Sequence, residues 1–251
     1  MHTLLASALL VAALGLVSCA STTSSSQPTG LAPWRVIGKS REGRPVRRMD
    51  IGTGGPRVAL IAGIHGNERE GGRHLEELLA VIAQQPANVR VYEDANPDGT
   101  AANRRTTSTG VDPNRNWPAF NFKADPRRGP SPLSEPAIAA LHADLVTFDP
   151  QLVIVLHSIS SGGPFVNYDG PAEGFAERFA QAAGEPWRVK ASMGYATPGS
   201  LGTWMGIDRE VPILTIEFKR GSPPEVTGPP LLRGLEAVLR DGPLESSTQV
   251  N

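Results

Sequence analysis

Two histidines and one glutamate in this 251-residue chain have the residue types and the sequence setting of a catalytic metal site. His65 and Glu68 lie three residues apart, directly after the apolar run RVALIAGI, and His157 ends a second apolar run, QLVIVLH. Zinc in catalytic sites takes three protein ligands, often two histidines and one glutamate, and keeps a fourth position for water. The other three histidines fall in the apolar N-terminal segment or inside predicted helices. His157 is therefore the natural partner of the first pair.

Each of these patterns also has an ordinary structural explanation. An HxxE motif is common by chance, and a histidine at a strand end is more often a satisfied polar residue. Glu217 adds a third observation, because it is an acidic residue within the apolar run VPILTIEF. Burying a carboxylate is unfavourable unless it is paired, hydrogen-bonded or functional. A structural salt bridge would account for Glu217, and so would a general base beside a metal-activated water.

A long polar segment, residues 96–133, separates the two halves of the expected metal site. Irregular segments of this length inside a compact domain are usually functional. This one carries Arg104, Arg105 and the motif VDPNRNW at 111–117. An arginine fork can bind a carboxylate bidentately, and an arginine near a metal can stabilise an oxyanion. Taken alone, an arginine-rich loop is usually only solvated; this one intervenes between two expected metal ligands.

The order of these motifs resembles that of the M14-type zinc metallocarboxypeptidases. HGNE, NPDG, an arginine pair, VDPNRNW, LHS, YATPGSLGTW and a strand-borne glutamate follow one another between residues 65 and 218. The resemblance implies one Zn²⁺ per chain, bound by His65, Glu68 and His157. It also implies that Glu217 is the catalytic base.

The same resemblance implies the residues that bind substrate. Asn114 and Arg115 would hold the carboxylate of the terminal residue, and Arg105 would polarise the scissile carbonyl, with Arg104 as the alternative. Tyr195 takes roughly the place of a mobile tyrosine that closes over the substrate. The spacing after Tyr195 departs by one residue from that of the digestive enzymes.

Within this family, the short chain with its TPGSLGTW and PILTIE segments is similar to the murein peptide amidase A subgroup. The similarity implies hydrolysis of an amide bond in cell-wall murein peptides, between γ-D-glutamate and meso-diaminopimelate. The alternatives are a zinc deacylase of N-acyl amino acids and a general C-terminal carboxypeptidase. A non-catalytic wall-binding lipoprotein is a further alternative, but loss of a metal ligand or of Glu217 would be its signature, and all four residues are present.

The elements that must position these residues follow from hydrophobic periodicity. Strands alternate with helices, which predicts a single α/β domain over residues 32–242 with a mostly parallel sheet covered on both faces. The family resemblance implies the same layout, a zinc-carboxypeptidase-like domain with a central mixed sheet flanked by helices. The expected strands are 34–40, 45–51, 57–64, 88–94, 151–156, 165–168 and 211–218, the first two as an edge hairpin, and the expected helices are 69–84, 135–147, 172–183 and 231–239.

Composition excludes several classes of protein. The formal net charge of −1 argues against a nucleic-acid partner, which normally requires a basic excess. The single cysteine excludes a disulfide within the chain and a cysteine-based zinc cluster. No protein partner is implied.

The cysteine itself, Cys19, predicts export. Residues 3–17 form an apolar run of the length of a signal-peptide core, too short to span a bilayer comfortably. The run ends in LVSC, which resembles a bacterial lipobox, although the residues before it include no lysine or arginine. We therefore expect a lipoprotein signal peptide at 1–18, lipidation of Cys19, a flexible tether at 19–31 and a tail at 243–251. An ordinary secretory signal is the alternative. Either predicts an exported protein, and the lipobox predicts membrane anchoring that faces the periplasm or the cell exterior.

Overall fold

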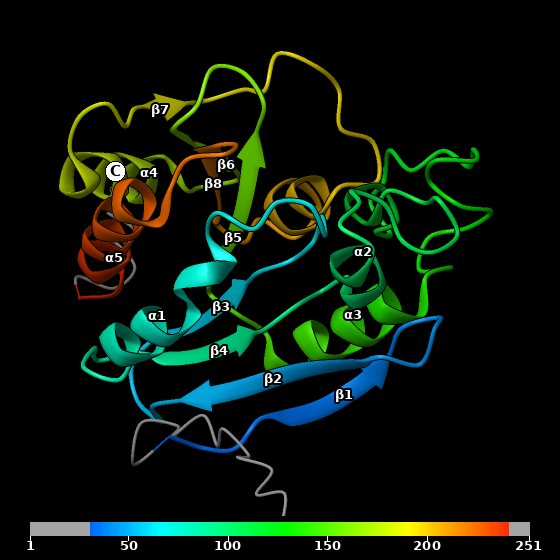
Figure 1. Ribbon diagram of the computed structural model, residues 1–251, viewed down its shortest axis with the longest axis horizontal. Helices are drawn as coiled ribbons and strands as arrows, with labels where there is room; N and C mark the ends of the chain where they lie inside the picture. The colour runs from blue at the N-terminus through cyan, green and yellow to red at the C-terminus, as the bar shows by residue number, and fades with distance from the viewer. Residues whose placement is uncertain (1–30, 241–251) are drawn as a thin grey trace, which may run out of the picture.

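A mixed sheet runs through the centre of the molecule in the computed structural model, which describes residues 31–240 (Figure 1). Its strands are β1 (Arg35–Lys39), β2 (Pro45–Ile51), β3 (Arg57–Ile61), β4 (Asn88–Tyr92), β5 (Leu152–Ile159), β6 (Phe165–Asp169), β7 (Val189–Lys190) and β8 (Ile213–Lys219). The order across the sheet is β1-β2-β4-β3-β5-β8-β6-β7. Four neighbouring pairs are parallel, and β1–β2, β2–β4 and β6–β8 are antiparallel. The predicted α/β class with a mixed, mostly parallel sheet is confirmed.

Helices cover both faces of this sheet. On one face lie α1 (Leu75–Ile82), α4 (Glu173–Ala183) and α5 (Pro224–Arg240), and on the other lies α3 (Pro136–Phe148). Successive side chains of a strand point to opposite faces, so Val58 and Leu60 pack with the first group while Ala59 and Ile61 pack with α3. Shorter helical segments complete the domain: α2 (Pro97–Ala101), the 3₁₀ turns Gly72–His74 and Pro113–Arg115, and a π-helical segment, Thr203–Asp208.

The three central strands position the chemistry. β3, β5 and β8 are neighbours and run parallel, so their carboxyl ends lie at the same edge of the sheet. His65 and Glu68 follow β3, and His157 of β5 lies directly opposite Glu217 of β8 in the strand register. The sheet therefore brings together residues that are far apart in the sequence.

Several element boundaries differ from the sequence-based expectation: α1 begins at Leu75 and not at residue 69, and β3 and β4 end at Ile61 and Tyr92 and not at residues 64 and 94. β5 continues to Ile159, so His157 lies within the strand and not after it. Helix α5 begins at Pro224 and not at residue 231, with Pro229 and Pro230 inside it. Proline lacks an N–H donor and usually ends a helix, which is why the prediction started after the prolines.

Tertiary packing holds the early turns of α5. His74 Nε2 lies 2.8 Å from Thr227 Oγ1, and both residues are buried. Gly228 lies against the same imidazole, where an added Cβ would come within 2.8 Å of the ring. Close contact with the 3₁₀ turn before α1 thus supports a helical start that local propensity disfavours.

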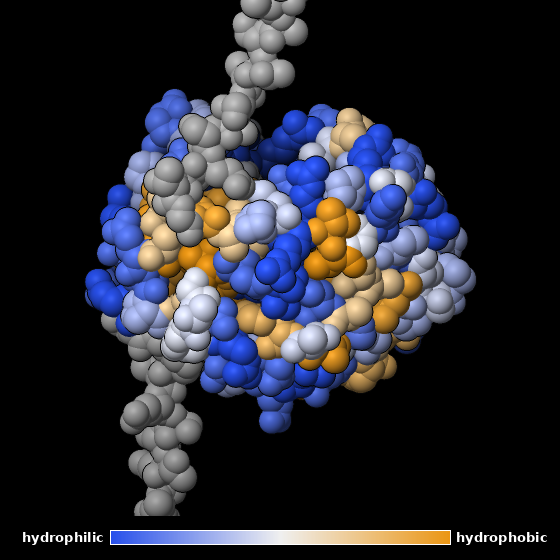
Figure 2. Space-filling model, turned by 90° about the horizontal axis from the view of Figure 1, so that it is seen from below, coloured by the Kyte–Doolittle hydropathy of each residue, from blue (hydrophilic) through white to orange (hydrophobic). Residues whose placement is uncertain are grey.

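The β1–β2 side of the molecule is shown in Figure 2, where hydrophilic and hydrophobic side chains are mixed. Edge strand β1 exposes the basic residues Arg35 and Lys39, and charged edges discourage pairing with another chain. No helix between residues 31 and 240 combines the length and apolar character needed to cross a membrane. The predicted signal peptide, Cys19, the tether through residue 30 and the tail at 243–251 lie outside the described residues.

Candidate active site and metal centre

A cavity of about 180 Å³ lies at the carboxyl ends of the central strands. It is lined by every residue assigned above to the metal, to catalysis or to substrate binding, while the alternative Arg104 does not line it. The structure brings these residues into one site, and their individual roles stay predictions. They are His65, Glu68, Arg105, Asn114, Arg115, His157, Tyr195 and Glu217.

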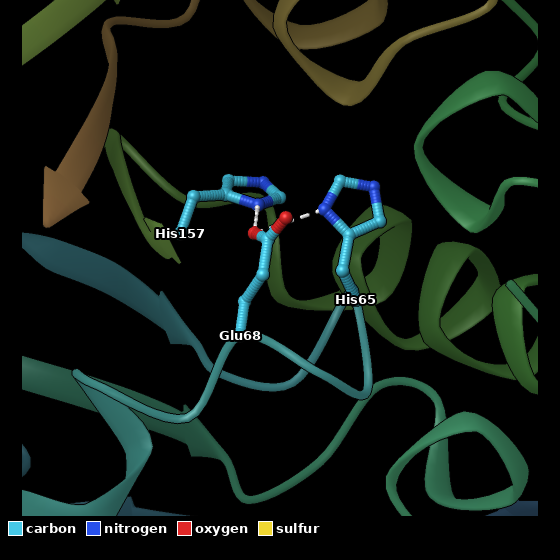
Figure 3. Close-up of side chains that lie close together, drawn as sticks. All are labelled: His65, Glu68 and His157. Atoms are coloured by element: carbon cyan, nitrogen blue, oxygen red, sulfur yellow. Dashed lines mark hydrogen bonds and ion pairs between the residues drawn. The ribbon is translucent and has the colours of Figure 1, made fainter. Parts of the chain in front are cut away.

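The imidazoles of His65 and His157 and the carboxylate of Glu68 point toward one another (Figure 3). One donor atom from each residue lies within 4.8 Å of the other two, and all three side chains are buried. Glu68 Oε2 is 2.8 Å from His157 Nδ1 and 3.0 Å from His65 Nδ1. Two imidazole nitrogens and one carboxylate oxygen form a ligand set typical of catalytic zinc.

The contacts of His65 show that this set suits a cation. Its Nε2 lies 3.0 Å from Asp112 Oδ1, an arrangement in which the imidazole donates its proton to the carboxylate. His65 Nδ1 then carries a lone pair; it is buried and makes no hydrogen bond, although Glu68 Oε2 lies 3.0 Å away. Two lone pairs that face each other in a buried site are unfavourable, and a divalent cation between them removes the conflict. The residues present fit a bound zinc ion.

Glu68 is held by charged donors on its second oxygen. Arg105 Nη1 and Arg220 Nη2 each donate to Glu68 Oε1 at 2.8 Å. Burial on its own would raise the pKa of Glu68, but the adjacent imidazoles of His157 and His65 outweigh burial and hold the pKa well below its usual range. Glu68 is therefore ionised, as a carboxylate metal ligand must be.

Asp112 and Arg220 support the metal set, and sequence reasoning assigned neither of them. Asp112 contacts His65 through Oδ1 and accepts a hydrogen bond from Arg105 Nε at 3.1 Å through Oδ2. Burial alone would raise the pKa of Asp112, but the hydrogen bond and charge of His65 and the charge of Arg105 lower it. Asp112 is also the N-cap of the 3₁₀ turn Pro113–Arg115, where its side chain accepts a hydrogen bond from the backbone N–H of Asn114. The Asp-Pro pair in the sequence indicates such a cap but not the contact with His65. Arg220, one residue beyond β8, belongs to no motif.

Glu217 lines the cavity beside His157, and its side chain is buried. No ion pair among the described residues involves it, and its Oε2 has no hydrogen-bond partner. A structural salt bridge therefore does not explain this acid. Burial, together with the negative charge of Glu68, raises the pKa of Glu217 despite the opposing charge of His157. A carboxylate with a raised pKa and an unpartnered oxygen is suited to accept and release a proton.

Asn114 and Arg115 come from the 3₁₀ turn Pro113–Arg115. Asn114 Oδ1 accepts a hydrogen bond from the backbone N–H of Leu201 at 2.9 Å, which fixes the orientation of its amide. Arg115 Nη1 donates to the carbonyl oxygen of Asn114 at 2.7 Å. Within residues 31–240 the Arg115 guanidinium makes no other hydrogen bond. Most of its five N–H donors are therefore available to a ligand.

Arg105 and Tyr195 complete the cavity wall. The Arg105 guanidinium is bound to both Glu68 and Asp112, which places it beside the metal set. The side chain of Tyr195 is 58% exposed and follows β7 in the chain. Closure of Tyr195 over a substrate stays a prediction.

Comparison with known proteins identifies the family to which this fold and site belong. A family model described as zinc carboxypeptidase (Peptidase_M14) matches residues 26–169, more than half of the chain. The chain belongs to this family and is a zinc metallopeptidase. His65, Glu68 and His157 form a possible binding site for its zinc ion.

Comparison with individual relatives shows which members of the family this chain resembles in sequence and structure. The chain is 31% identical over 176 residues to murein peptide amidase A of Escherichia coli strain K12, an alignment that covers 63% of this chain and 69% of the relative. The protein of the same name from Vibrio campbellii is 25% identical over 180 residues, covering 64% and 69%. Among solved structures, murein-tripeptide amidase MpaA from Escherichia coli O157 superposes with a TM-score of 0.74 at 26% identity, covering 88% of this chain and 96% of that one.

Proposed function

We propose that this chain is an amidase of cell-wall murein peptides that hydrolyses the bond between γ-D-glutamate and meso-diaminopimelate. One observation carries the proposal: a fitting metal set, an unpartnered buried acid and an arginine with free donors line a single cavity. The similarity to murein peptide amidase A supports the choice of substrate. The residue released by this reaction carries a free carboxylate, for which Arg115 offers a binding group.

The chemistry follows from the placement of the side chains. Zinc, when bound by His65, Glu68 and His157, supplies a Lewis acid that polarises the scissile carbonyl and acidifies water. Glu217 accepts a proton from the attacking water and passes it to the leaving amine as the C–N bond breaks and a C–O bond forms. Arg105 donates hydrogen bonds to the carbonyl oxygen as negative charge develops there.

Asn114 and Arg115 orient the substrate by binding its terminal carboxylate. A guanidinium can bind the carboxylate of the terminal residue bidentately, and the Asn114 amide nitrogen adds a donor next to it. Asp112 holds His65 in the tautomer needed for metal binding, and Arg220 holds Glu68. Fixing the substrate at both ends of the scissile bond converts a bimolecular step into a nearly unimolecular one.

A panel of substrates tests the proposal. The zinc-loaded protein is incubated with L-Ala-γ-D-Glu-meso-diaminopimelate, an N-acyl amino acid and an α-linked C-terminal dipeptide, and the products are identified by mass. Release of diaminopimelate at the highest kcat/KM supports the amidase. Hydrolysis mainly of the N-acyl amino acid would indicate the deacylase, and of the α-linked peptide a general carboxypeptidase. No turnover of any substrate by zinc-loaded protein would indicate a wall-binding role.

We also propose that the chain is exported and anchored through a lipid on Cys19, facing the periplasm or the cell exterior. The support is the apolar N-terminal run and the LVSC sequence. Incorporation of labelled palmitate and membrane fractionation of the wild type and of Cys19→Ala test this location. Because Cys19 is the single cysteine, the variant should lose all thiol-directed lipid. Unchanged labelling would contradict the proposal.

A further inference from the structure

A short turn directly after the VDPNRNW motif, residues 118–122, takes no part in the proposed reaction. The backbone N–H of Phe122 donates to the carbonyl oxygen of Ala119 at 2.9 Å, which closes the turn. Phe120, within the turn, is 77% exposed. None of residues 118–122 lines the active-site cavity. Any effect of this turn on the reaction must therefore pass through the residues that it contacts.

Asn121 joins the turn to a second segment, residues 195–202. Its Oδ1 accepts a hydrogen bond from the backbone N–H of Gly199 at 2.9 Å. The carbonyl oxygen of the same Gly199 accepts a hydrogen bond from the backbone N–H of Trp117 at 3.0 Å. Both polar groups of the Gly199 backbone are thus bound by residues on or next to the turn. Gly199 cannot move away without breaking both hydrogen bonds.

Gly199 itself lies against the residues expected to bind the terminal carboxylate. Its φ is +70°, and a Cβ added to it would lie 2.4 Å from the carbonyl oxygen of Arg115. Glycine suits both the left-handed backbone and this close approach, because it has no Cβ. Two residues further on, the backbone N–H of Leu201 donates to Asn114 Oδ1 at 2.9 Å. The position of Gly199 is therefore coupled to that of both Asn114 and Arg115.

The chain before Gly199 depends on this attachment. The hydrogen bonds found for residues 192–198 in the described part of the chain stay within residues 192–203. Four residues of this stretch line the cavity: Ser192, Met193, Tyr195 and Thr197. A loop without hydrogen bonds to the rest of the domain takes its position from its two ends. Gly199 lies just beyond the end that is packed against Arg115.

We propose that Asn121 is a positioning residue that holds Gly199 against Arg115 and so sets the geometry of the carboxylate anchor. Without the Asn121 amide oxygen, the Gly199 N–H loses its acceptor, and residues 195–201 gain freedom relative to the guanidinium. Substrate then binds to an anchor that is less preorganised, so its binding weakens. The metal set lies on other elements and is unaffected. The inference rests on the proposed function for the carboxylate that Arg115 binds, and it adds a residue outside the cavity to that function.

Kinetics on the zinc-loaded protein test the inference. With L-Ala-γ-D-Glu-meso-diaminopimelate, Asn121→Ala should raise KM about 10-fold and change kcat by less than about threefold, because small displacements of a substrate-positioning group are costly. Asn121→Asp keeps an oxygen acceptor for the Gly199 N–H and should return KM to within about threefold of the wild type. Lys123→Ala, an exposed residue just beyond the turn, is the control. Loss of kcat instead of a rise in KM, or no recovery in Asn121→Asp, would overturn the positioning role.

A double-mutant cycle shows whether Asn121 acts through Arg115. In the Arg115→Ala background, Asn121→Ala should change kcat/KM by less than about twofold, because the anchor that it positions is already absent. The same loss in this background as in the wild type would show that Asn121 acts independently of Arg115, which contradicts the inference.

Hydrogen exchange without substrate separates the inference from the proposed function. Asn121→Ala should speed amide exchange in residues 192–201 by about 10-fold, while peptides from β5 and β8 match the wild type. If this result accompanies no cleavage of any γ-linked peptide, only the substrate proposal is wrong, and α-linked peptides with free and amidated termini then provide the kinetic comparison. Unchanged exchange in residues 192–201, or an equal increase across the sheet, would overturn the role of Asn121.

Discussion

Glu68 and Glu217 are carboxylates of the same cavity whose pKa values are shifted in opposite directions. Burial acts to raise both pKa values, but Glu68 lies against two imidazoles while Glu217 keeps an unpartnered oxygen. Two acids whose environments shift their pKa values in opposite directions usually have different catalytic roles. Glu68 is suited to remain ionised as a ligand, and Glu217 to exchange a proton.

Replacement of Glu217 by glutamine tests that division. The change removes the base and keeps the shape, so Glu217→Gln should bind zinc and substrate normally and lose about 10²- to 10⁴-fold in kcat. Zinc content by elemental analysis and kcat on the tripeptide are the measurements. Glu225→Gln, an exposed acid at the start of α5, serves as the control. Turnover near that of the wild type in zinc-replete Glu217→Gln would rule out the role of base.

Replacement of Arg115 tests the carboxylate anchor. Arg115→Ala should lower kcat/KM for substrates with a free terminal carboxylate by about 10- to 100-fold, because charge-assisted hydrogen bonds are lost. Substrates with an amidated terminus should be little affected. Arg127→Ala, an exposed arginine of the same segment, should change neither. Equal losses on free and blocked substrates would show that Arg115 acts in another way.

The residues that could be predicted were those marked by a contrast with their surroundings. His65, His157 and Glu217 stand out because each is a polar residue at or near the end of an apolar strand. Asp112 and Arg220 have no such contrast, and their contacts depend on how loops and strands pack. Spacing in the chain carries no information about those distances.

At the scale of elements, a partly buried acid, Asp94, lies between the loops that follow β3 and β4. Asp94 follows β4 and accepts a hydrogen bond from the backbone N–H of Asn96 at 2.9 Å. Gly63, after β3, has φ of +70°, and a Cβ there would lie 2.5 Å from Asp94 Oδ1. Burial raises the pKa of Asp94 to about 6, although hydrogen bonds from Thr100 and Asn96 oppose the shift.

This raised pKa predicts a pH dependence of stability. Between about pH 4 and pH 6 the unfolded chain releases the Asp94 proton while the folded protein retains it. The free energy of unfolding should therefore fall as the pH rises through that window, by up to about 3 kcal/mol for two pKa units. Denaturant unfolding of wild type and Asp94→Asn at several pH values measures the difference, in which other titrating groups cancel. Parallel curves for the two proteins would contradict the prediction.

The start of α5 shows where reasoning from local propensity reaches its limit. The prolines and Gly228 within residues 224–230 argue against a helix, and the structure forms one because Thr227 and Gly228 pack on His74. Strands with continuous apolar runs were predicted well, because burial on both faces leaves a strong pattern. The two-residue strand β7 is too short to leave any pattern.

For the whole molecule, alternating strands and helices were enough to predict the class of fold but not the order of the strands. That order places β5, which carries His157, between β3, which leads to His65 and Glu68, and β8, which carries Glu217. Residues 96–133 then close over this edge and contribute Arg105, Asn114 and Arg115. The site is thus a property of the complete domain and not of any one motif.

Titration of the metal-free protein with zinc, followed by the rate of amide hydrolysis, tests the central claim most directly. Chelator-treated protein should be inactive, and activity should rise in proportion to added zinc and reach its plateau at one zinc per chain. His157→Ala should bind zinc far more weakly under the same conditions, because it removes one of three ligands. Full activity in protein shown to be free of metal, or a plateau unrelated to zinc content, would contradict the account.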